Sequence, residues 1–143
     1  MPSLKEIRNK KPGDIVQSDK TGDIPLSDFV KEYIKKKYKK PGEVFLGTIH
    51  RIDRPTSGVI LFARTSKALS RMNEKFKQKE VKKTYWAIVN NPPPNTNGIL
   101  ENYLLKDSKK NKSFISKKLK GKIAILRYKI LRKLYNFYHL EIK

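Results

Sequence analysis

The segment HRIDRPTSGVILFA, residues 50–63, joins a polar stretch to an apolar one, and the chain is organised around it. Its one carboxylate, Asp53, stands between Arg51 and Arg54, and Arg64 follows directly after the segment. The apolar second half is typical of a buried strand that begins where a turn ends. The segment therefore predicts a charged loop mounted on a sheet.

The composition indicates a polyanionic partner. The chain has 143 residues, of which 37% are hydrophobic, enough for one domain with a modest core. Its 34 Lys+Arg and 13 Asp+Glu leave a formal net charge of +21, which opposes compaction and attracts polyanions such as nucleic acid. The alternative is that the lysines only keep the surface soluble.

Several classes of site and location are disfavoured by the sequence. The chain has no cysteine, so it has neither disulfides nor a cysteine-based zinc site. His50 and His139 are far apart in sequence, and we expect no metal. No apolar run reaches the roughly 18 residues of a membrane span, and the N-terminal residues do not resemble a signal peptide. We expect a cytoplasmic protein, with a monomer favoured.

Upstream of the segment we predict a lead-in and one helix. Residues 1–24 are turn-rich, and only Ile15–Gln17 is expected to be extended. A helix is predicted from Pro25, with Ser27 as a possible cap and Pro41-Gly42 as its end. Its apolar positions recur at helical spacing: Leu26, Phe29, Val30, Tyr33, Ile34 and Tyr38. The lysines on its outer face either contact phosphate or are simply solvated.

The remaining pattern predicts an α+β fold. A strand is expected at residues 44–49, another at Gly58–Ala63, and a second helix opens at Thr65 or Ser66. Further extended segments are expected at residues 82–89, 99–105, 113–117, 123–131 and 137–142. We therefore predict a mixed, mostly antiparallel sheet with two flanking helices.

The neighbours of Asp53 allow two hypotheses for its chemical role. Arginines favour its charged form, so it suits a nucleophile, a base or an electrostatic stabiliser better than a general acid. Alternatively, its carboxylate caps the turn by accepting from the amides of Thr56 or Ser57 while the arginines bind phosphate. Tyr85 also has two readings, as a half-buried strand aromatic or as a stacking platform for a base.

The segment resembles a known family. HRIDRPTSG, residues 50–58, is similar to the HRLDxxTSG signature of the RluA-type RNA pseudouridine synthases, and the likeness continues through VILFARTSKAL. KTYWAIV, residues 83–89, resembles that family's K-x-Y-x-A-x-V motif. Asn9-Lys10 with Pro12-Gly13 resembles its N-K-P-x-G start. Further landmarks fit in order: Gly98, Leu105-Lys106-Asp107 and Gly121-Lys122-Ile123-Ala124.

The resemblance implies a cofactor-free isomerisation of uridine to pseudouridine in ribosomal or transfer RNA. It makes Asp53 the catalytic aspartate, which attacks C1′ or removes the C2′ proton. Tyr85 would stack on the target base and assist removal of the C5 proton, and Arg51 would occupy the place of the flipped nucleotide. The RNA-binding set implied by the resemblance is Arg51, Arg54, His50, Thr56 and Arg64.

Family members carry a further motif, similar to L-x-T-G-R-x-H-Q-I-R, whose arginine pairs with the catalytic aspartate. It is expected after a strand like Tyr138–Ile142, where this sequence ends. We therefore expect residues 1–143 to form a single, partial catalytic domain that lacks the C-terminal part of the fold and has no separate RNA-binding domain. Such a chain would be weakly active or inactive by itself. The alternative is a non-catalytic basic RNA-binding protein derived from the same fold.

Overall fold

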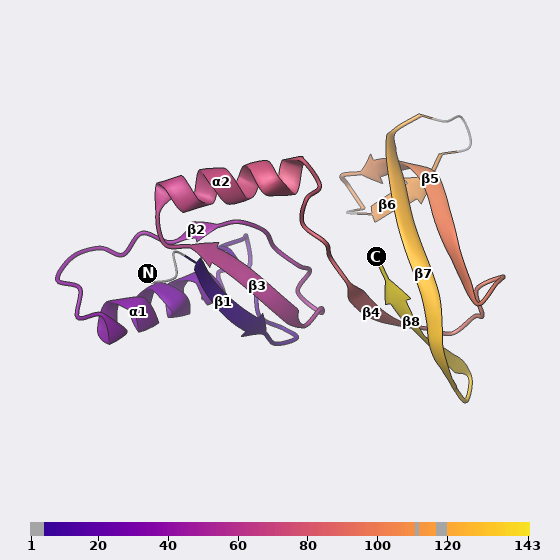
Figure 1. The fold of residues 1–143 in the computed structure, drawn as a ribbon, viewed down its shortest axis with the longest axis horizontal. Helices are drawn as coiled ribbons and strands as arrows, with labels where there is room; N and C mark the ends of the chain where they lie inside the picture. The colour runs from indigo at the N-terminus through magenta and orange to yellow at the C-terminus, as the bar shows by residue number, and fades with distance from the viewer. Residues whose placement is uncertain (1–4, 111, 117–119) are drawn as a thin grey trace. The chain divides into compact units, whose positions relative to one another are not determined.

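The computed structural model describes residues 5–110, 112–116 and 120–143, with the side chains of residues 5–7 left undescribed. Its elements are β1 (Lys5–Lys10), α1 (Leu26–Lys37), β2 (Gly47–Thr48), β3 (Gly58–Ala63), α2 (Ser66–Lys77), β4 (Tyr85–Val89), β5 (Asn97–Asp107), β6 (Lys112–Ile115), β7 (Lys122–Leu134) and β8 (Phe137–Ile142) (Figure 1). They form two compact units, Met1–Val81 and Lys82–Lys143, which are described separately. The described strands make two sheets in which every pair is antiparallel, so the predicted α+β class is confirmed.

The first unit is built around β3. This strand lies between β1 and β2 in a three-stranded sheet, and Figure 1 shows the two helices on opposite sides of it. The register pairs Lys5 with Ala63 and Lys10 with Gly58, so β1 accompanies β3 along its whole length. The last residue of β1 and the loop before β3 therefore lie at the same end of the sheet. Asp53 is in that loop.

The lead-in was predicted incorrectly. It contains β1, and the segment after that strand packs into the core, with Ile15 and Val16 buried and no strand at Ile15–Gln17. The carbonyl oxygens of Ile15 and Val16 accept the backbone N–H groups of Leu26 and Ser27, at 2.7 and 3.3 Å. These bonds satisfy donors at the start of α1 that have no partner inside the helix. The expected Ser27 cap is therefore wrong, because backbone carbonyls take its place.

The helix α1 has the predicted start, but its apolar stripe is narrower than expected. Val30 and Ile34 are buried in a core cluster, whereas Phe29, Tyr33 and Tyr38 are exposed, contrary to the prediction. The members of that cluster are Val16, Val30, Ile34, Val44, Ile60 and Phe62. The Arg8 guanidinium lies 4.2 Å from the centre of the Tyr33 ring. The pKa of the Tyr33 phenol is lowered most by a hydrogen bond from Lys37 and next by one from Arg8.

The strand and helix on either side of Arg64 agree with the sequence pattern. Both β3 and α2 are confirmed, and the Thr65 hydroxyl accepts the Ala68 N–H at 3.1 Å as an N-cap. The strand expected at residues 44–49 is shorter, because only Gly47–Thr48 pairs with β3. None of the described helices is long and apolar enough to cross a bilayer.

The second unit is a five-stranded sheet in the order β4-β8-β7-β5-β6. The strands predicted in this half are confirmed with shifted ends, although Lys117 lies outside the described residues. Tyr128 and Leu140 are buried on one face of the sheet. Gly98 lies opposite Tyr128, and a Cβ added at Gly98 would come within 2.8 Å of the Tyr128 hydroxyl. Gly98 therefore provides the space that the Tyr128 side chain occupies.

We expect Gly98→Ala to destabilise the second unit by about 1–3 kcal/mol, because the added methyl forces Tyr128 out of its packed position. The fluorescence of Trp86, the single tryptophan, reports unfolding of this unit in urea. Gly42→Ala is the matched control, since a Cβ there meets nothing within 4 Å. Equal urea midpoints for the two variants would contradict the packing role of Gly98.

Candidate active site

Asp53 lies in the loop between β2 and β3, and its backbone closes the turn that shapes this loop. The Asp53 carbonyl accepts the Thr56 N–H at 3.0 Å, as in a β-turn. The carboxylate is exposed and makes no hydrogen bond or ion pair within the described part of the chain. The capping alternative is therefore wrong, because the main-chain oxygen holds the turn and the carboxylate remains available to a ligand.

A buried lysine fastens this loop to the lead-in. The Lys10 side chain is 0% exposed, and its ammonium donates to the carbonyl oxygens of Lys11, Arg54 and Thr56, at 3.1, 2.9 and 2.8 Å. An ammonium has three donors, so all of them are used. The Arg54 carbonyl also accepts the Gly13 N–H at 2.9 Å. The backbone next to Asp53 is thus fixed by a charged group that can be buried because three carbonyl dipoles solvate it.

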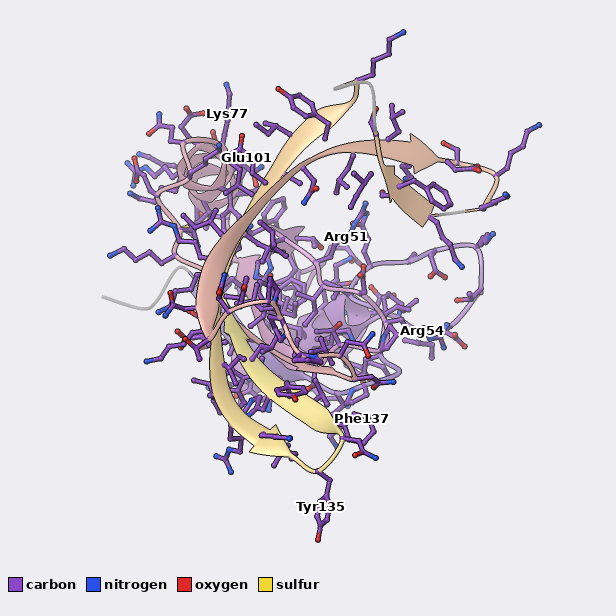
Figure 2. The ribbon with its side chains drawn as sticks, turned by 90° about the vertical axis from the view of Figure 1, so that its right-hand side faces the viewer. Arg51, Arg54, Lys77, Glu101, Tyr135 and Phe137 are labelled. Carbon is purple, nitrogen blue, oxygen red and sulfur yellow. The ribbon has the colours of Figure 1, made fainter. Side chains whose placement is uncertain are left out.

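The arginines of the loop have different partners from those expected. The Arg54 guanidinium pairs with Asp23, with 2.6 Å between Nη2 and Oδ2, and the Arg54 side chain is labelled in Figure 2. Both side chains are about half exposed, so this ion pair contributes at most about 1 kcal/mol. Arg51 is exposed beside Asp53 in the same loop. The sequence analysis did not find Asp23 as the partner of Arg54, because the two residues are 31 positions apart.

Arg64 is separated from Asp53 by the length of β3. The strand has six residues, and at about 3.3 Å per residue it spans roughly 20 Å. At the far end the Arg64 guanidinium lies 4.3 Å from the centre of the Tyr38 ring and donates to its hydroxyl at 3.2 Å. Arg64 therefore lies at the opposite end of β3 from the Asp53 loop, while its role in RNA binding stays a prediction.

His50 is built into the framework of the loop. Its Nε2 accepts the Leu61 N–H of β3 at 3.1 Å, so this nitrogen carries no proton. Its ring stacks on Phe76 of α2, with the ring centres 5.2 Å apart and the planes inclined by 21°. The histidine thus joins the start of the loop to the sheet and to the helix.

Replacing His50 with phenylalanine retains a stacking ring but removes the acceptor of the Leu61 N–H. We expect the first unit to lose about 1–3 kcal/mol, because a partly buried donor is left unpaired. Hydrogen exchange at the Leu61 amide measures this directly, and its rate should rise. His139→Phe is the control, since His139 packs edge-on against Trp86 in the second unit. Unchanged protection of Leu61 would show that the bond to His50 contributes nothing.

Tyr85 opens β4 in the second unit. It pairs with Ile142 of β8, and Ile142 in turn pairs with Tyr128 of β7, so Tyr85 continues the face that carries the core of this unit. Its side chain is 39% exposed, and its ring joins none of the ring contacts among the described residues. Asp53 belongs to the first unit and Tyr85 to the second.

The described residues include no group of three or more histidine, cysteine, aspartate or glutamate side chains that could hold a metal ion. The chemical groups of the loop are the exposed carboxylate of Asp53 and the exposed guanidinium of Arg51, on a backbone held by Lys10 and His50. A carboxylate that makes no hydrogen bond or ion pair with the described residues can act as a base or a nucleophile towards a bound ligand.

Solved structures identify the class of the fold. The chain superposes on the human protein RNA pseudouridylate synthase domain containing 4 with a TM-score of 0.78 and 21% identity, covering 96% of this chain and 54% of that one. RNA pseudouridylate synthase domain containing 1 gives 0.73 and 16%, with 99% and 56% covered. At these identities the likeness establishes the fold: that of the pseudouridylate synthase domains.

The family follows from the sequence comparisons. The family model described as RNA pseudouridylate synthase matches residues 7–143, and the chain belongs to this family. An uncharacterized RNA pseudouridine synthase of Zymomonas mobilis is 43% identical over 86 residues, which are 59% of this chain and 39% of that protein. Ribosomal large subunit pseudouridine synthase C of Buchnera aphidicola is 35% identical over 95 residues, 66% and 30% of the two chains.

A third relative has a different named substrate. The tRNA pseudouridine synthase C of Haemophilus influenzae is 58% identical over 41 residues, which are 29% of this chain and 17% of that protein. The chain thus spans well under half the length of these curated relatives and about half the length of the two solved chains.

Proposed function

We propose that this chain carries the catalytic aspartate of an enzyme that converts uridine to pseudouridine in ribosomal or transfer RNA. Family membership supports the reaction class, and the names of the relatives support both kinds of RNA. The observation that carries the proposal is the exposed carboxylate of Asp53, which has no partner among the described residues, on a loop whose backbone Lys10 holds in place. The proposed substrates make the cytoplasm the expected location.

The reaction needs no cofactor, because its atoms and electrons balance within the nucleoside. The bond between N1 and C1′ breaks, the uracil turns, and a bond forms between C5 and C1′. The C5 proton leaves and N1 gains a proton. Asp53 either attacks C1′ or removes the C2′ proton, and both roles require the ionised form. Tyr85 stacks on the uracil and assists loss of the C5 proton.

The RNA is held by groups around the loop. Arg51 enters the RNA and occupies the position of the extruded nucleotide, as in enzymes that flip a base before acting on it. Arg54, His50 and Thr56 of the loop, together with Arg64 at the far end of β3, complete the binding set that we propose. Because the net charge is +21, binding should weaken steeply with salt as counterions are released.

The test uses protein from the complete reading frame and unmodified transcripts of ribosomal and transfer RNA. We expect conversion of one or a few uridines, detected at single-base resolution after incubation. Binding of the same transcripts without any conversion would favour the rival assignment, a non-catalytic RNA-binding protein. Salt-dependent binding alone does not separate the two, because both bind phosphate.

A further inference from the structure

The turn between β7 and β8 presents an aromatic side chain to solvent. Leu134 pairs with Phe137, which leaves Tyr135 and Asn136 as a two-residue turn. Tyr135 is 96% exposed, and Figure 2 shows its side chain projecting from the tip of the hairpin, away from the ribbon.

The fold of the unit does not account for a tyrosine at this position. Its φ of 50° lies in the left-handed region, where a bulky residue costs on the order of 1 kcal/mol, and two-residue hairpin turns favour glycine, asparagine or aspartate there. An exposed ring buries no surface that could offset this cost. Strain of this kind, held at an exposed position, is a reason to look for a function.

The surroundings of Tyr135 indicate the chemistry of its partner. Arg132 and Lys133 are adjacent in β7, so they point to opposite faces of the hairpin, and both are exposed. The register of β7 against β8 shifts between Ile130 and Arg132, next to these cations. An exposed aromatic ring at the tip of a hairpin whose stem carries exposed cations suits single-stranded nucleic acid, through stacking and phosphate contacts, and of these cations Lys133 also lies 5.9 Å from the centre of the Tyr138 ring.

We propose that Tyr135 stacks on an unpaired base of the substrate RNA other than the target uridine, while Arg132 and Lys133 bind the adjoining phosphates. The inference rests on the proposed function for the identity of the partner as RNA. An unpaired base is required, because a paired base in an A-form helix does not offer its face to a side chain. Tyr135 would thus help to select the RNA rather than perform the chemistry.

The test compares Tyr135→Gly with Tyr135→Phe in protein from the complete reading frame. The probes are an RNA hairpin with an unpaired loop and a fully paired duplex of the same stem. We expect Tyr135→Gly to raise the dissociation constant for the hairpin about 5- to 100-fold, the range of base–aromatic stacking, with little change for the duplex. Its Tm should stay the same or rise, because glycine relieves the positive φ. Tyr135→Phe should bind as the original protein does.

Lys79→Gly is the matched control, because Lys79 is another exposed residue with positive φ, at 58°. It should change the affinity for hairpin and duplex equally.

Hairpin binding by Tyr135→Gly at the original affinity would overturn the inference. A Tm of Tyr135→Gly several degrees lower would overturn it too, because it would show that the Tyr135 ring packs against other parts of the protein. Selective loss of hairpin binding without any pseudouridine formation would sustain this inference and refute the proposed function. Pseudouridine formation with unchanged Tyr135→Gly binding would refute this inference alone.

Discussion

Asp53→Asn is expected to abolish pseudouridine formation while leaving the fold and RNA affinity nearly unchanged. The substitution preserves shape but removes the group that attacks C1′ or takes the C2′ proton, so the rate should fall by about 10²- to 10⁴-fold for a base and by about 10⁴-fold or more for a nucleophile. The turn should survive because it uses the Asp53 carbonyl. Single-turnover conversion of a defined RNA measures the rate, and urea unfolding should agree with the original protein within about 0.5 kcal/mol.

Asp28→Asn is the control for this prediction. Asp28 is an exposed aspartate of the same unit, in the first turn of α1, where it pairs with Lys31 at 3.8 Å. The same chemical change there should leave the rate within a few-fold, since the loss of one exposed surface charge changes little. If Asp53→Asn converted uridine as fast as Asp28→Asn, the catalytic role assigned to Asp53 would be lost.

Lys10→Met should have the second large effect. Methionine matches the length of the lysine stem but donates no hydrogen bond, so the carbonyls of Arg54 and Thr56 lose their shared donor. We expect the first unit to lose about 2–4 kcal/mol, because the Thr56 carbonyl loses its donor and the Arg54 carbonyl keeps only the Gly13 N–H, while only part of this is recovered by no longer burying a charge. Far-UV circular dichroism in urea gives the stability. The turnover should also fall, because the Asp53 turn is no longer held in one position.

Lys11→Met is the matched control for the fastening role. Lys11 is the next residue in the chain, and it is exposed. Removing its charge should change the free energy of unfolding by no more than about 0.5 kcal/mol. Hydrogen exchange of the Thr56 amide distinguishes the two variants further, since its bond to Asp53 should open more often only in Lys10→Met. Equal protection of Thr56 in both variants would contradict the role of Lys10.

Hydrophobic periodicity predicted the elements whose burial follows a regular pattern. The strand β3 is a continuous apolar run, and α2 places Ala68 and Met72 on one buried side after a threonine cap. The extended segment predicted at residues 123–131 is likewise found as β7, in which Tyr128 is buried. In these elements the local pattern and the tertiary environment agree.

The lead-in could not be predicted in this way. The strand β1 reads KEIRNK, which has a single apolar residue and no alternation, and it forms because its backbone pairs with β3. Lys10 would be assigned to solvent by any scale of hydrophobicity, yet carbonyls that come from 44 and 46 residues further along make its burial possible. Only the arrangement of the folded chain contains that information.

The partners of Arg54 and Arg64 were also beyond sequence reasoning. Adjacent charges in a sequence point in directions that the backbone decides, so Arg54 reaches Asp23, and Arg64 reaches Tyr38 at the other end of β3. The roles of Asp53 and Tyr85 came from the family resemblance rather than from charge or periodicity. They stay predictions until activity is measured.

The most direct measurement is a map of pseudouridine in ribosomal and transfer RNA at single-base resolution. It compares cells that carry the gene, cells that lack it, and cells that carry Asp53→Asn at the natural locus. We predict that at least one uridine is modified only in the first of these and remains unmodified in the other two. Identical maps in all three, or a modification that persists with Asp53→Asn, would contradict the account.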